Sequence, residues 1–345
     1  DRSPSRGLGD VYKRQAMYAK TKAWHGLGTV VEDYPNVKEA LKLSGLDWEV
    51  LQSDYLYAEV EGDTYIADGY VANIRSDTNE VLGVVSKDYQ PVQNRELFDI
   101  AEAAAGQHCK VETAGSLKGG RNVYLLLKAD SFAVGEDEIQ PYFGLFDGKD
   151  GSMSTCGLNT GVRVVCSNTM EYAMSGAIHK VTLRHRGNTI DDVYDQMCDA
   201  ITNFKETGKI FREKVDHIAT YAHWNEDRIQ KFFKECYVNI IDPSIKKEKD
   251  EVKKEKYSIK MGTSIMKMQA KMQAELELNL NVSTGWLAAN AVTNYIQKKQ
   301  GERGRKTSTE SRIQSNLIGA GATQSSKVMR TALNWSSISD SLPAN

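Results

Sequence analysis

The sequence predicts an α+β fold, in which an antiparallel β-rich N-terminal part with a few helices is followed by a mainly helical C-terminal part. Between Trp48 and Pro91, short segments rich in aromatic and β-branched residues alternate with turn residues, as in a meander. Helical segments interrupt the strands only at intervals, which favours an antiparallel sheet over a doubly wound parallel one. Beyond residue 189, apolar residues recur with the 3.6-residue period of helices.

The N-terminal part begins with a helix expected at residues 36–45, because Asn36 can cap it, Glu39 completes a capping box and Gly45 ends it. A second helix is expected from Asn94 to Ala105, and a third after Asn168. Gly119-Gly120 indicates a hairpin turn between two strands. The expected strands are 55–60, 65–66, 70–75, 81–85, 110–114, 121–129, 139–146 and 162–166.

The C-terminal part contains helical patterns that begin with caps. Thr189 and Asp192 form a capping-box pattern, and Asn225 can cap the next helix, which ends before Asp242-Pro243. Methionines at 261, 266, 268 and 272 indicate adaptable core packing. The last clear helix passes through Trp286 and Tyr295 to Lys298-Lys299.

These patterns suggest four segments. Residues 1–15 are interpreted as adapter-derived sequence or a disordered tail, and they are left out of the fold prediction. An α+β domain is expected at 16–188, and a mainly helical region at 189–335 with a charged loop or helix surface near 243–257. Residues 336–345 are expected to be frayed.

Charge and cysteine content narrow the class of protein. Residues 245–345 carry 17 Lys and Arg but only 9 Asp and Glu, whereas the whole chain has a net charge of −2. A basic C-terminal part that follows an acidic N-terminal part favours an anionic partner. The alternative is that the opposite charges of the two parts pair with each other across an internal interface. The five cysteines form no CxxC pair and no signal peptide is evident, which favours a cytoplasmic location. No apolar run is long enough to span a membrane, so no membrane partner is expected.

Several segments in order resemble one known family. They include Trp24-His25-Gly26-Leu27-Gly28, Tyr89-Gln90-Pro91-Val92-Gln93-Asn94, Arg163-Val164-Val165-Cys166-Ser167-Asn168-Thr169 and Asn290-Ala291-Val292-Thr293-Asn294-Tyr295. Together they resemble the phage/plasmid-like family whose domain is catalogued as domain of unknown function number 932. The resemblance implies a mobile-element origin and the cytoplasm of a bacterial host, but no established activity. The chain departs from the family pattern at Lys149, Ser167 and Lys180, where His, Gln and Thr are usual.

No catalytic motif stands out. The histidines lack the spacing of a tetrahedral metal site, so neither a metal nor a cofactor is expected. Cys166 lies at an expected strand–helix junction, where a thiolate could be activated with His179 or His25 as base, although a buried free cysteine is the commoner case. The segment Gly319–Lys327 resembles a phosphate loop, but it lacks the glycine before Lys327 and has Val328 in place of Ser or Thr.

Two basic clusters remain as candidate nucleic-acid contacts, since such clusters neutralise phosphates. The candidate residues are Arg121, Arg163, Lys180, Arg184 and Arg186, and then Lys298, Lys299, Arg303, Arg305 and Lys306.

The leading hypothesis is a non-enzymatic protein that binds or anneals single-stranded DNA in phage or plasmid recombination or replication. One alternative is a protein–protein interaction or counter-defence factor of a mobile element. The other is a cysteine-dependent enzyme that uses Cys166. Assembly into a homo-oligomer is left open.

Overall fold

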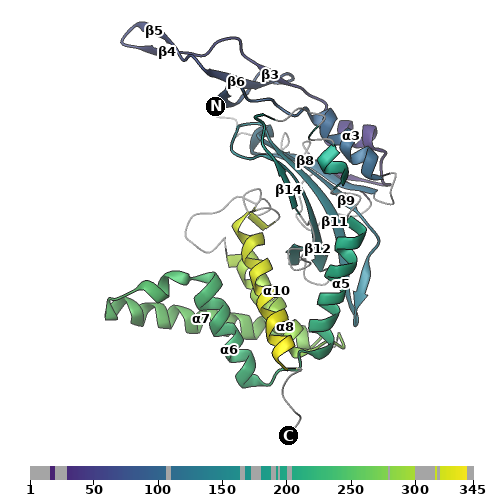
Figure 1. The fold of residues 1–345 in the computed structure, drawn as a ribbon, viewed down its shortest axis with the longest axis vertical. Helices are drawn as coiled ribbons and strands as arrows, with labels where there is room; N and C mark the ends of the chain where they lie inside the picture. The colour runs from purple at the N-terminus through teal and green to yellow at the C-terminus, as the bar shows by residue number, and fades with distance from the viewer. Residues whose placement is uncertain are drawn as a thin grey trace, which may run out of the picture. The chain divides into compact units, whose positions relative to one another are not determined.

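The structure is a computed structural model that describes residues 16–19, 29–105, 110–163, 168–171, 180–187, 192, 195–199, 204–278, 280–299, 315–316 and 319–339. It is an α+β protein with an antiparallel β-rich N-terminal half and a helical C-terminal region (Figure 1). The predicted fold class is therefore confirmed.

In the described part of the N-terminal half, short strands and the helices α2 and α3 precede a set of longer strands. The expected capping box at Asn36 forms, with Glu39 N donating to Asn36 Oδ1 (2.9 Å) and Asn36 N donating to Glu39 Oε2 (3.1 Å). The elements are β1 (Ala16–Ala19), β2 (Thr29–Val31), α2 (Val37–Leu43), β3 (Val50–Gln52), β4 (Tyr57–Val60), β5 (Asp63–Ile66), β6 (Tyr70–Arg75), β7 (Val81–Ser86), α3 (Asn94–Ala105), β8 (Lys110–Leu117), β9 (Asn122–Lys128), β10 (Phe132–Val134), β11 (Asp137–Gly148), β12 (Thr155–Arg163), β13 (Asn168–Glu171) and β14 (Lys180–Leu183).

The C-terminal region is built from helices. They are α5 (Phe204–Tyr221), α6 (Glu226–Cys236), a π-helical turn (Tyr237–Ile241), a 3-10 turn (Pro243–Lys247), α7 (Glu251–Leu276), α8 (Thr284–Lys299) and α10 (Ala320–Ser339). The cap predicted at Asn225 is present, since its side chain accepts from Arg228 N.

The strands form one large sheet and two small ones. The large sheet has the order β13-β12-β11-β9-β8-β1-β2, with β10 on β11 and β14 on β12. Strands β1 and β2 are parallel, whereas the pairs β1–β8, β8–β9, β9–β11, β10–β11, β12–β13 and β12–β14 are antiparallel. The small sheets are β3-β6-β7 and the hairpin β4-β5. The turn predicted at Gly119-Gly120 joins β8 to β9, and both glycines have positive φ. A Cβ on Gly120 would lie 2.9 Å from Arg75 Nη1, so this turn needs glycine.

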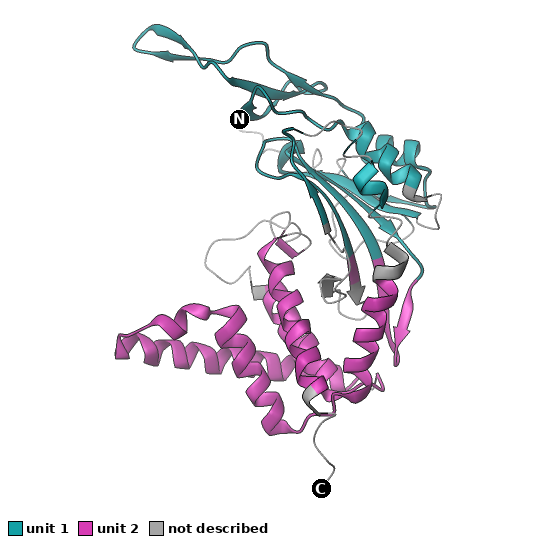
Figure 2. Cartoon of the chain, in the orientation of Figure 1, with its two compact units in different colours: residues 1–130, 142–159, 180–205 teal, residues 131–141, 160–179, 206–345 magenta. Residues whose placement is uncertain are grey.

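The chain divides into two compact units (Figure 2). Unit 1 comprises residues 1–130, 142–159 and 180–205, and unit 2 comprises residues 131–141, 160–179 and 206–345. In unit 1, α3 packs on β8 and β9 through the apolar face predicted for it, which includes Leu97, Phe98 and Ala101. In unit 2, α8 packs against α7 and α10, and the buried Trp286 donates from Nε1 to Asp137 Oδ2 at 2.9 Å.

Three sequence-based expectations need correction. The helix expected to begin after Asn168 does not begin there, because residues 168–171 pair with β12 as β13, and backbone pairing in a sheet satisfies the same groups as a helix would; residues 172–179 lie outside the described part. Of the two alternatives for the charged stretch near 243–257, the helix surface is confirmed for residues 251–257, which form the first turns of α7 after its cap Asp250, and a single loop is wrong. Helix α10 was not predicted from the sequence. Residues 336–339, which were expected to be frayed, belong to this helix, and residues 340–345 lie outside the described part.

Candidate functional site

The structure describes only part of the predicted basic set. Arg121 is exposed in the turn before β9, Arg184 and Arg186 are exposed just after β14, and Lys298 is exposed near the end of α8. For Arg163, Lys180 and Lys299 only the backbone is described, at the ends of β12, β14 and α8. Arg303, Arg305 and Lys306 lie outside the described residues, as do Cys166, His25 and His179.

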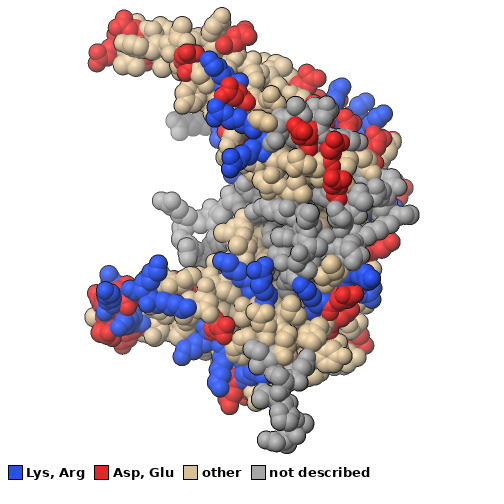
Figure 3. Space-filling model, in the orientation of Figure 1, with Lys and Arg blue, Asp and Glu red and all other residues tan. Residues whose placement is uncertain are grey.

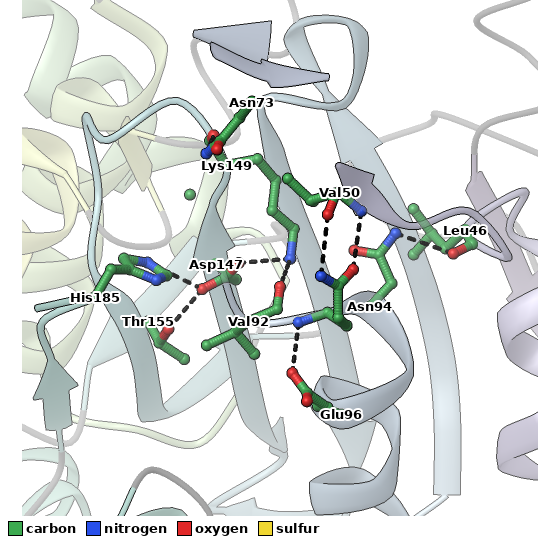
Figure 4. Close-up of polar contacts among 12 residues, drawn as sticks. Leu46, Val50, Asn73, Val92, Asn94, Glu96, Asp147, Lys149, Thr155 and His185 are labelled. Carbon is green, nitrogen blue, oxygen red and sulfur yellow. Dashed lines mark hydrogen bonds and ion pairs between the residues drawn. The ribbon is translucent and has the colours of Figure 1, made fainter. Parts of the chain in front are cut away.

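A buried polar network lies in unit 1 (Figure 4). It contacts the backbone of Arg121 and includes His185, which lies between Arg184 and Arg186 in the chain. Its centre is the ion pair of Asp147 Oδ2 with Lys149 Nζ at 2.6 Å, and both side chains are 0% exposed. Thr155 Oγ1 donates to Asp147 Oδ1 at 2.5 Å, and His185 Nε2 lies 3.3 Å from the same oxygen. Lys149 Nζ also donates to the Val92 carbonyl. The network thus connects β11, the strand β12 and the segment after β14 to the chain before α3.

Hydrogen bonds and ring stacking close this network. Tyr89 stacks on the His185 ring, with centroids 4.5 Å apart, and donates its hydroxyl to the Gly148 carbonyl. Asn73 Nδ2 donates to Lys149 O at 2.7 Å, and Lys149 N donates to Arg121 O at 2.7 Å. The side chains contact one another and are shielded from solvent, so this arrangement fixes the loops that carry them.

Charge within the network is set by pairing. Burial alone would raise the pKa of Asp147, but Lys149 and then His185 outweigh it and hold that pKa below its ordinary value. Burial, with Asp147 and Asp150 nearby, raises the pKa of Tyr89 far above its ordinary value. Asp147 is therefore a carboxylate and Tyr89 a neutral hydroxyl at neutral pH.

This network fixes the segment that carries Arg184 and Arg186, two of the predicted nucleic-acid contacts, and leaves both side chains exposed to solvent. His185 points inward to Asp147, and its neighbours Arg184 and Arg186 are exposed. Arg186 pairs with Asp88, from Nη2 to Oδ2 at 2.5 Å, and both side chains are more than half exposed. Part of the positive charge of this patch is thus offset locally, which makes it a weaker anion site than its sequence indicates.

A second site lies in unit 2, at an open pocket of about 570 Å³. It is lined by Asn225, Asp227, Arg228 and Lys231 from the start of α6 and by Trp335 from α10. Arg228 Nη2 donates to the Trp335 carbonyl at 2.6 Å. The guanidinium carbon of Arg228 is 5.6 Å from the centre of the Trp335 ring and 5.8 Å from that of Trp224, so it makes cation–π contacts with both.

The pocket combines an aromatic ring with groups that bind anions. Trp335 is held by ring contacts with Trp224 and Phe232, each with centroids 5.6 Å apart. Lys231 is exposed and lines the pocket, so an anionic oxygen of a ligand would be stabilised beside its ammonium group. Asp227 also lines the pocket and limits its net positive charge.

Sequence patterns did not reveal this pocket. Asn225 was identified as a helix cap, which places Arg228 and Lys231 one turn apart on the same face of α6. Trp335, however, is more than 100 positions away along the chain, and its helix was not predicted. No local motif joins these residues.

The described residues show no other recognisable site chemistry. Among them, no three His, Cys, Asp or Glu side chains come together as a metal ion would need. Within the same residues, no helix combines the length and the apolar character that crossing a bilayer requires. Cys156 and Cys236 are buried, and burial, with Glu235 nearby, raises the pKa of Cys236 well above its ordinary value, which disfavours its thiolate.

Comparison with known proteins identifies the family but not an activity. No curated protein and no solved structure matches the chain. Residues 81–317, more than half of the chain, match the family described as a domain of unknown function, DUF932. This range includes Asp147, Lys149, Thr155 and His185 of the buried network and the α6 side of the pocket. The resemblance to the domain family number 932 is thereby confirmed, and the chain belongs to the DUF932 family.

Proposed function

We propose that this protein binds single-stranded nucleic acid, DNA being favoured, and that unit 2 provides the binding surface. The observation that carries the proposal is the pocket in which Trp335 lies beside Arg228 and Lys231. Proteins that bind single strands without sequence preference use aromatic faces for the bases and cations for the backbone. The pocket offers both, and its volume of about 570 Å³ suits a ligand the size of a nucleotide.

Charge supports the same assignment. Residues 245–345, all within unit 2, have a net charge of +8, from 17 basic and 9 acidic residues. A phosphate backbone would be attracted to such a surface in a salt-dependent manner. In this proposal, Trp335 stacks on a base, while Arg228 and Lys231 face phosphate oxygens. The role in phage or plasmid recombination or replication belongs to the same proposal.

The test is the binding of a fluorescent single-stranded oligonucleotide to the full chain, measured by anisotropy across a salt series. We compare Lys231→Glu, in the pocket, with Lys234→Glu, an exposed lysine of the same helix that does not line it. Both changes alter the net charge equally. Lys231→Glu should weaken binding markedly more and should reduce the salt slope by about 0.7, the contribution of one phosphate contact on a single strand.

Trp335→Leu tests the stacking, because leucine keeps an apolar side chain but removes the ring. Loss of one stacked base, worth about 1–3 kcal/mol, should weaken binding about 5- to 150-fold. The thermal midpoint of each variant is measured to confirm folding. Absence of salt-sensitive binding at micromolar protein, or equal losses in Lys231→Glu and Lys234→Glu, would refute the proposal. A loss confined to Arg184→Glu and Arg186→Glu would move the site to unit 1.

A further inference from the structure

The β4–β5 hairpin presents apolar side chains to solvent on both of its faces. Tyr57 pairs with Ile66 on one face, and Ala58 pairs with Tyr65 on the other. Tyr57 and Ile66 are 67% and 71% exposed. Among the described residues, no further strand pairs with this hairpin. A two-stranded hairpin by itself is only marginally stable in water, so covering these faces would stabilise it.

The charge of the hairpin is uniform. Residues 54–66 contain Asp54, Glu59, Glu61 and Asp63 and no Lys or Arg. Figure 3 shows acidic side chains and uncharged surface at the tip of the chain where β4 and β5 lie in Figure 1. Such a surface repels a phosphate backbone, and it fits a partner that is apolar with a basic border.

Helix α7 offers a surface of that kind. Val252, Ile259 and Met266 are seven residues apart and are 63%, 65% and 69% exposed, so they form an apolar seam along one side of the helix. No side chain before Ser264 is buried in this helix. The seam is accompanied by an excess of positive charge, since residues 251–267 contain five lysines and two glutamates: Lys253, Lys254, Lys256, Lys260 and Lys267 with Glu251 and Glu255.

We propose that the β4–β5 hairpin of one protein molecule binds the apolar seam of α7 on a second copy of the same chain. Both surfaces carry exposed apolar side chains, and they differ in the sign of their charge: the hairpin is acidic and the α7 seam is basic. Both surfaces belong to this chain, so a second copy always supplies the matching partner at the protein's own concentration. The contact joins different surfaces of the two copies, which makes it heterologous and lets it continue into a ring or a filament.

Two charge-reversal variants test this contact. The hairpin variant carries Glu59→Lys and Asp63→Lys, and the helix variant carries Lys253→Glu and Lys256→Glu. All four residues are exposed. Association of the full chain is measured by sedimentation velocity over a protein concentration series at low and high salt. The control Asp99→Lys with Glu102→Lys has the same charge change as the hairpin variant, on exposed positions of α3.

Wild type and the α3 control should associate with rising concentration, and less so at high salt. Each reversal variant alone should lose at least about tenfold in its association constant, because like charges then face each other. An equimolar mixture of the two variants should restore association, since each then offers the charge that the other requires. Tyr57→Ser with Ile66→Ser, which leaves the charge unchanged, should weaken association as well.

Other results would overturn the proposal. A wild-type protein that stays monomeric at all concentrations would exclude the contact between two copies. The same result would be obtained if the hairpin docked within its own chain. Undiminished association of the hairpin variant would assign self-association to α7 pairing with itself. A mixture that fails to restore association would refute the charge pairing. Should a charge-reversal variant fold poorly, as judged by its thermal midpoint, the Tyr57→Ser with Ile66→Ser variant decides the matter, since undiminished association of that variant would also exclude the hairpin contact. The sedimentation experiment contains no nucleic acid, so its result does not depend on whether the protein binds single-stranded nucleic acid.

Discussion

Replacing Lys149 by methionine is expected to lower the free energy of unfolding by about 3–5 kcal/mol, the usual cost of removing one partner of a buried ion pair. Lys149 is fully buried, pairs with Asp147 at 2.6 Å and donates to the Val92 carbonyl. Methionine fills similar volume, so the cost arises mainly from the carboxylate of Asp147, which keeps only Thr155 and His185.

The dependence on pH gives this prediction a specific signature. In the wild type the pKa of Asp147 is lowered, so the stabilisation is present above the unfolded carboxyl pKa of about 3.9 and is lost as pH falls through the folded value. In Lys149→Met, burial is no longer offset by the lysine, and the pKa of Asp147 should rise. Protonation of Asp147 then removes the unpaired buried charge of the variant. The difference in unfolding free energy between wild type and Lys149→Met should therefore shrink as the pH falls from about 7 to about 4.

Urea unfolding followed by circular dichroism at both pH values measures this deficit. Two further variants identify its cause. The double variant Asp147→Asn with Lys149→Met removes the buried charge and should regain at least about 1 kcal/mol relative to Lys149→Met. Lys149→His keeps an N–H donor and should lose less than Lys149→Met. A deficit below about 1 kcal/mol, or one that does not change with pH, would show that the pair does not hold this part of unit 1 together.

Three other predictions concern single positions. Asn36→Ala removes the capping box of α2 and should cost about 1 kcal/mol in urea unfolding; an unchanged midpoint would contradict it. Gly285→Ala should cost about 1–3 kcal/mol, since its Cβ would lie 2.6 Å from Ala222 Cβ and 2.7 Å from Ala222 O; a neutral effect would mean that the helix shifts freely. The buried Cys236 should resist alkylation at about pH 8 until urea unfolds the chain, as peptide mass spectrometry would show; rapid labelling of native protein would disagree.

Local patterns determined much of the secondary structure. The capping box at Asn36, the helix from Asn94, the cap at Asn225 and the turn at Gly119-Gly120 each depend on residues within a few positions of one another, and all are present. The assignment to the DUF932 family also followed from short segments in order.

Expectations failed where distant partners compete with local preference. Residues 168–171 pair as a strand because β12 is beside them, and local pattern carries no record of that neighbour. Helix α10 has an apolar face that packs on α8 but contains many small and polar residues, so its periodicity is weak in the sequence.

The sequence by itself determined the α+β class, the starts of several helices, the family and the separation of acidic and basic segments. Only the tertiary structure decided which residues meet. It paired Asp147 with Lys149 and His185, and it brought Trp335 to Arg228 across 107 positions. The physical reason is that burial and pairing depend on separations in space, whereas propensity, capping and periodicity act over a few residues of chain.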